Sequence, residues 1–158
     1  MFNKPIIEAT HDLVCSYKLN TAFYEAIGYK GVEELKKTCD YLKKKYPEIP
    51  IIIDAKRGDI GSTNSGYVQF IFTYLGADAV TVQPYLGEEA IKPFLDYKDK
   101  GIIILCRTSN KGAGEFQNLH VIPTEVEGSL YSLTKGFPHL PCQAIGGQVD
   151  FTRNDRLN

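Results

Sequence analysis

Four charged side chains beside short apolar runs have types and spacing that suit proton chemistry. Asp54, Lys56 and Asp59 directly follow the three isoleucines at 51–53, and Lys18 follows an earlier apolar stretch. Side chains two positions apart in a strand point the same way, so Asp54 and Lys56 are expected to project together. Carboxylates beside a lysine keep it charged, and such a lysine can deliver a proton to a carbanion. On spacing alone, salt bridges that only stabilise strand ends explain the pattern equally well.

The elements that must position these side chains alternate regularly along the chain. Apolar runs rich in Ile and Val predict strands, and periodic apolar residues between the runs predict helices. Continuous apolar strands that each precede a helix are typical of a parallel sheet with both faces covered, so the predicted class is α/β. Strands are expected at residues 13–18, 51–56, 79–82 and 102–106, and helices at 21–28, 31–46, 62–75 and 88–97.

Two architectures fit four such units: an open doubly wound sheet and a (β/α)8 TIM barrel. Polar side chains stand at or just past the expected carboxyl ends of all four strands, namely Lys18, Asp54, Gln83 and Arg107. Barrel enzymes gather their chemistry at that face, so the barrel is favoured. A complete barrel needs about 250 residues. We therefore expect an incomplete barrel of about four β/α units over residues 1–120, followed by an irregular tail over 121–158.

Composition restricts the partners that the chain can have. The 158 residues are 43% hydrophobic and carry a formal net charge of −1, which is typical of a globular protein that binds neither nucleic acid nor an anionic membrane. The apolar runs are too short to span a bilayer. The four cysteines are scattered without a C-x-x-C pair, and two lie in apolar runs. This indicates reduced core residues of a cytoplasmic protein, and no histidine spacing suggests a metal site.

Several ordered blocks of sequence resemble one enzyme family. Residues 54–63, DAKRGDIGST, closely resemble the D-x-K-x-x-D-I-x-x-T signature of the orotidine 5′-phosphate decarboxylases. The resemblance covers about residues 5–120 and includes three further blocks, ATHDLVCSYK, GADAVTVQPYLG and LCRTSN. The last of these, LCRTSN, is similar to the bacterial branch of the family. Sugar-phosphate decarboxylases and aldolases of the same superfamily share the D-x-K-x-x-D core. They are expected to carry an acidic metal ligand where this chain has Lys18, whereas the orotidine enzymes carry lysine and use no metal.

The resemblance implies a reaction and three roles. The reaction is the loss of CO2 from orotidine 5′-phosphate to give uridine 5′-phosphate, in pyrimidine (UMP) biosynthesis, without metal or other cofactor. Lys56 would stabilise the carbanion at C6 of the ring and then protonate it. Asp54 would lie near the departing carboxylate and hold Lys56, while Lys18 would contact the ribose and Asp54.

The same resemblance implies that the site is shared between two subunits. Asp59 and Thr63 would reach into the active site of a second copy, so the family pattern implies a homodimer. Ser109 would bind the pyrimidine amide from a mobile loop. Simpler readings stay open for two of these residues, because Thr63 can serve the start of a helix and serine is common in loops.

Parts of the family pattern have no secure counterpart in this sequence. The pattern begins with a strand that carries an aspartate for the ribose, and it ends with strands that carry a glycine-rich phosphate loop and an arginine. We therefore expect a fragment with little activity of its own, because the energy of binding the remote phosphate lowers the barrier at the reacting carbon. The alternatives are an inactive remnant or a partner-dependent fragment of such an enzyme, or a sugar-phosphate decarboxylase or aldolase.

Overall fold

The computed structural model describes residues 2–117. These residues belong to two compact units, Met1–Leu105 and a second unit that begins at Cys106. The tail predicted over 121–158 lies outside the described residues, so the predicted boundary at residue 120 stays a prediction.

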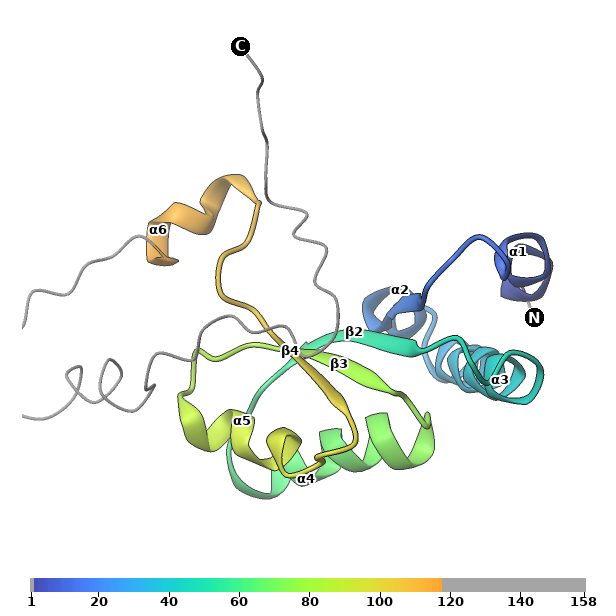
Figure 1. Cartoon of the computed structure of the whole chain (residues 1–158). Coiled ribbons are helices and arrows are strands. Elements are labelled where there is room, and N and C mark those ends of the chain that lie inside the picture. The colour runs from blue at the N-terminus through green and yellow to red at the C-terminus, as the bar shows by residue number, and fades with distance from the viewer. Residues whose placement is uncertain (1, 118–158) are drawn as a thin grey trace, which may run out of the picture. The chain divides into compact units, whose positions relative to one another are not determined.

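The first unit is built around a four-stranded parallel sheet (Figure 1). Its strands pair in the order in which they occur in the chain: β1 (Tyr17–Asn20), β2 (Ile51–Arg57), β3 (Ala79–Val82) and β4 (Gly101–Ile104). At least one helix lies between each strand and the next. The predicted α/β class with four β/α units is therefore confirmed.

The helices begin and end within a few residues of the predicted ranges. The long amphipathic helix predicted at 31–46 is present, and the helix predicted at 62–75 consists of an α-helical part and a π-helical part. Between the strands lie α2 (Thr21–Glu25), α3 (Tyr29–Lys45), α4 (Gly61–Val68) with the π-helix η1 (Gln69–Tyr74), and α5 (Glu88–Leu95). The second unit contains the 3-10 helix η2 (Lys111–Ala113) and α6 (Gly114–Gln117). None of the described helices is long and apolar enough to cross a membrane.

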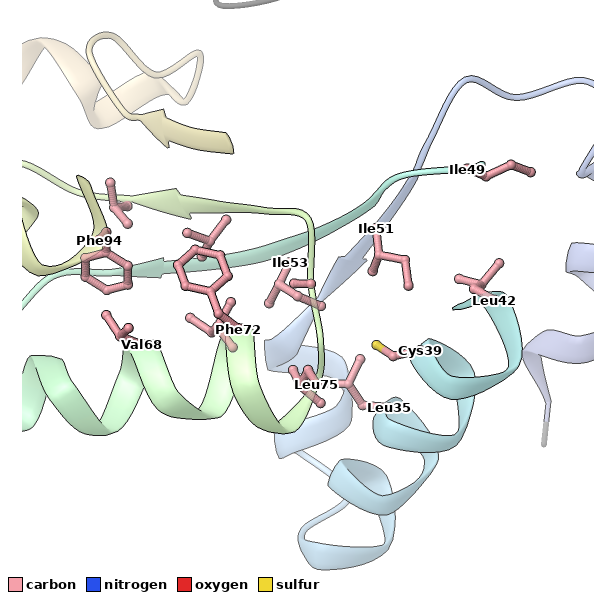
Figure 2. Close-up of a cluster of buried hydrophobic side chains, with 14 of the residues drawn as sticks. Leu35, Cys39, Leu42, Ile49, Ile51, Ile53, Val68, Phe72, Leu75 and Phe94 are labelled. Atoms are coloured by element: carbon pink, nitrogen blue, oxygen red, sulfur yellow. The ribbon is translucent and has the colours of Figure 1, made fainter. Parts of the chain in front are cut away.

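The core lies between the sheet and the helices that connect its strands. Ile51 and Ile53, two positions apart on β2, point to the same side and are almost fully buried. Figure 2 shows them beside an apolar stripe of α3, and the helix after β2 supplies the opposite part of the same cluster. The labelled helical members are Leu35, Cys39, Leu42, Val68, Phe72 and Phe94. This packing leaves the alternate residues of β2, including Asp54, on the other face of the sheet.

The amino-terminal segment differs from the prediction. The strand expected at 13–18 is wrong in its start, because β1 begins at Tyr17, whose N–H donates to the carbonyl of Pro50 at 3.0 Å. An additional helix that the sequence pattern did not predict, α1 (Asn3–Thr10), precedes it. Residues 11–16 are needed to connect helix and strand, so Leu13 lies in this connection and is 77% exposed. Because α1 buries one residue, Ile7, its apolar periodicity is too weak to detect.

The cysteines also divide differently from the expectation. Cys39 is buried in α3, and burial raises the pKa of its thiol to about 12. Cys15 and Cys106 are exposed, so the prediction that cysteines in apolar runs are core residues is wrong for these two. In both cases the residue follows an apolar run but lies outside the strand itself.

Candidate active site

Asp54 is the centre of the charged cluster. It is 7% exposed, and its carboxylate accepts from donors on three neighbouring strands. The Nζ atom of Lys56 lies 2.6 Å from Oδ1, and that of Lys18 lies 3.2 Å from Oδ2. The Thr81 hydroxyl donates to Oδ1 at 2.8 Å. The structure therefore brings together three of the four charged residues selected from the sequence and adds a hydroxyl.

The pairing of the strands explains this convergence. Lys18 on β1 lies opposite Ile52 on β2, and Ile52 lies opposite Ala79 on β3. Side chains alternate between the two faces of a strand, so Lys18, Asp54 and Thr81 share the face that does not pack on the helices. Lys18 lies at the second position of β1 and not at its end, yet its long side chain reaches along the sheet to Asp54.

The backbone of β2 is irregular at Lys56. Ile53 pairs with Val80 but Arg57 pairs with Val82, so β2 has two more residues than β3 between these pairs. Lys56 takes a positive φ of 49°, which is rare for a residue with a side chain and costs about 1–2 kcal/mol. Bulges of this kind redirect side chains next to functional sites. The irregularity accompanies the contact of the Lys56 ammonium with the carboxylate two residues before it.

The surroundings of Asp54 keep it ionised. Burial by itself raises the pKa of this carboxyl and is the largest single cause, whereas hydrogen bonds from Lys56 and Thr81 lower it. The bond and charge of Lys18 act in the same direction, and the pKa of Asp54 is lowered from its ordinary value. The side chains of Lys18 and Lys56 are about half exposed, 55% and 49%. The cluster thus presents two accessible ammonium groups, both held by one buried carboxylate.

Asp59 lies in the turn between β2 and α4 and, among the described residues, forms no ion pair with Lys18 or Lys56. Its Oδ1 accepts the N–H of Ile60 at 2.8 Å, and its own N–H donates to the side chain of buried Asn64 at 3.1 Å. Gln83 holds the same turn by donating to the carbonyl of Gly58 at 2.9 Å. The four-member array that the spacing made possible therefore has three members within this chain.

Thr63 and Ser109 are both exposed. Thr63 lies near the start of α4, on the first unit. Ser109 belongs to the second unit, in a loop whose neighbours are joined to α6: the N–H of Thr108 donates to Gln117 at 2.9 Å, and Gln117 donates back to the Thr108 hydroxyl at 2.9 Å. The roles assigned to Thr63 and Ser109 by resemblance stay predictions.

Sequence reasoning missed two buried polar residues. Thr81 supports the cluster, and Asn64 supports the turn that carries Asp59. Thr81 has a weak signal in the sequence, because it is the one hydroxyl in the Ala-Val-Thr-Val run. Asn64 has none, and only the structure shows that it is fully buried. Buried polar side chains need partners, which directs attention to the groups they bind.

Comparison with known proteins identifies the family. The model of the Orotidine 5′-phosphate decarboxylase / HUMPS family matches residues 2–133, which is most of the chain. The chain belongs to this family. The orotidine 5′-phosphate decarboxylase of Flavobacterium johnsoniae is 49% identical over 134 residues, covering 85% of this chain and 49% of the relative. That of Dehalococcoides mccartyi is 53% identical over 118 residues, covering 75% of this chain and 43% of the relative.

Solved structures of the orotidine 5′-phosphate decarboxylase family have the same fold. OMP decarboxylase from Leishmania donovani matches with a TM-score of 0.70 at 41% identity, covering 75% of this chain and 46% of that one. The Plasmodium berghei enzyme matches with a TM-score of 0.67 at 37% identity, covering 74% and 37%. The family and the incomplete barrel predicted from the sequence are both confirmed. The chain spans about half the length of the curated relatives it matches.

Proposed function

We propose that this chain carries the charged part of an active site that decarboxylates orotidine 5′-phosphate to uridine 5′-phosphate. The observation that supports the proposal is the buried Asp54 carboxylate held between Lys18 and Lys56. It occurs in a family whose curated relatives carry the name of that reaction. On this proposal the chain acts in pyrimidine biosynthesis, as a cytoplasmic enzyme.

The chemistry follows from charge placement. When the bond between C6 and the carboxylate breaks, CO2 leaves and the electron pair stays at C6. A preorganised ammonium group stabilises that charge without having to reorient during the reaction. Lys56 then transfers a proton from Nζ to C6 and is left neutral, and its half-exposed side chain regains a proton from solvent. Asp54 holds the Lys56 ammonium group in place before the reaction.

The remaining site residues have proposed roles in binding. Lys18 contacts the ribose through the part of its ammonium group that Asp54 does not occupy. Ser109 binds the pyrimidine, and Asp59 and Thr63 complete the site of a second copy in a homodimer. The exposure of Thr63 is compatible with contact across such an interface.

The proposed reaction needs neither metal nor another cofactor. Lys18 places a positive charge beside Asp54, and this cation repels Mg²⁺. The sugar-phosphate enzymes of the superfamily are expected to hold an acidic metal ligand at the same position. The residue at this position therefore distinguishes a metal-free decarboxylase from a metal-dependent sugar-phosphate enzyme, and removal of metal by a chelator tests which of the two is right. A decarboxylase of the proposed kind keeps its full rate in EDTA, whereas a metal-dependent lyase loses activity.

The experiment compares the chain with an extended version, completed at both ends by the parts of the Flavobacterium johnsoniae relative that this chain does not match. Formation of uridine 5′-phosphate is expected to be weak for the chain and clear for the extended version. Lys56→Ala should lower turnover by a factor of about 1,000 or more, mainly in kcat, because the ammonium acts as charge develops. Lys44→Ala on the exposed side of α3 is the matched control and should keep normal turnover.

Three outcomes would contradict the proposal. Near-normal turnover of Lys56→Ala would show that another group protonates C6. Inhibition by EDTA would favour the sugar-phosphate reading. An extended chain that folds but does not decarboxylate would favour an inactive remnant.

A further inference from the structure

We propose that Thr81 is a positioning residue that fixes the geometry of the Asp54–Lys56 ion pair. This inference rests on the proposed function for its catalytic meaning. Thr81 lies on β3, is 3% exposed, and contacts both members of the pair through a single hydroxyl oxygen.

The direction of both hydrogen bonds follows from their chemistry. The backbone N–H of Lys56 can only donate, so the Thr81 Oγ1, 3.0 Å away, must accept from it. The single hydroxyl proton is then free to point at Asp54 Oδ1 at 2.8 Å. Oδ1 is also the atom that accepts from the Lys56 ammonium at 2.6 Å. One oxygen thus links the backbone of the lysine to the carboxylate atom that its own side chain binds.

The irregularity of β2 explains why the hydroxyl is needed. In a regular ladder the N–H of a strand residue pairs with a carbonyl of the neighbouring strand. The register between β2 and β3 shifts between Ile53 and Arg57, and the N–H of Lys56 in this interval is satisfied by the Thr81 side chain. The bond therefore holds Lys56 at its positive φ, a conformation that persists only where the surroundings support it.

Packing does not by itself require a hydroxyl at this position. The neighbours Val80 and Val82 are fully buried valines on the other face of β3. Valine has nearly the shape of threonine, so Thr81→Val deletes the two hydrogen bonds while it retains the volume. Thr81→Ser keeps the oxygen and deletes a methyl group. The two variants separate positioning from packing.

The test uses the complete 158-residue chain and NMR. In Thr81→Val the backbone amide of Lys56 should lose protection from hydrogen exchange. The pKa of Asp54 should rise, because the charged carboxylate loses a donor while Lys18 on β1 and Lys56 on β2 still face it. Thr81→Ser should match the original chain in both measurements. Thr81→Ala, which removes the hydroxyl without requiring the space of a second methyl, provides a second deletion if the valine variant does not fold.

Kinetics of the same variants in the extended version, measured in the decarboxylation assay, give the catalytic readout. Thr81→Val should lower kcat about 10- to 100-fold, the effect of one bond to a charged group, with little change in KM, and Thr81→Ser should restore the rate. An unchanged Asp54 pKa in Thr81→Val, or a serine variant as impaired as the valine one, would overturn the inference. The NMR result does not depend on turnover, so an inactive extended version together with a shifted Asp54 pKa would refute the proposed function and leave the positioning role supported.

Discussion

Replacing Lys56 by glycine should give a more stable protein than replacing it by alanine, the reverse of the usual order. Lys56 has a φ of 49°, in the left-handed region that penalises every residue with a Cβ atom. Both substitutions remove the same ammonium and the same ion pair with Asp54, so these losses cancel in the comparison. What remains is the backbone: alanine keeps the strain and glycine releases it.

The size of the difference can be worked out from two terms. The left-handed conformation costs an L-residue about 1–2 kcal/mol, and glycine loses about 0.5–1 kcal/mol more backbone entropy than alanine on folding. The balance favours Lys56→Gly by roughly 0.5–1 kcal/mol. For a chain of this length that corresponds to a rise in Tm of about 1–4 °C relative to Lys56→Ala.

Urea denaturation followed by circular dichroism measures the difference directly. The matched control is Lys37, exposed in the middle of the regular helix α3, where Lys37→Ala should be more stable than Lys37→Gly by about 1 kcal/mol. A Lys56→Ala variant as stable as Lys56→Gly, with the control pair in the expected order, would refute the argument that the lysine is held in a strained conformation. If glycine is the more stable replacement and both Lys56 variants lack turnover, the strain is a cost of placing the ammonium group.

Two further predictions concern acid stability and packing. The pKa of Asp54 is lowered from 3.8, so the contribution of this carboxylate to stability is present above pH 3.8 and is lost as the pH falls through the folded-state pKa. In Asp54→Asn the free energy of unfolding should therefore fall less steeply in acid. A pH profile identical to that of the original chain would contradict this. Gly101→Ala should lower the free energy of unfolding, measured by urea denaturation, by about 1–3 kcal/mol, because the new Cβ would lie 2.9 Å from that of Ala79. Gly66→Ala in α4 meets open space and should raise the same free energy by about 0.5–1 kcal/mol. Equal effects of the two substitutions would show that the β3–β4 contact is looser than described.

Local patterns in the sequence were sufficient for the elements and the motif. The strand at 79–82 and the helix at 31–46 were predicted closely, because apolar periodicity records which face of an element is buried. The order of strands and helices then implied a parallel sheet. Asp54 and Lys56 could be selected because a charged pair directly after three consecutive isoleucines is exceptional. The sequence alone could not detect α1, whose single buried residue leaves no periodic signal.

The tertiary structure decided how the charged residues meet. The contact of Lys18 with Asp54 depends on the register between β1 and β2, and the bond from Thr81 joins positions 27 residues apart. Register is a property of two paired strands, so no single stretch of sequence contains it. The positive φ of Lys56 likewise depends on the irregular pairing of β2 with β3. The sequence therefore determined which groups are available for chemistry, and the pairing of the strands determined their distances, because hydrogen bonds between strands are formed only when the sheet assembles.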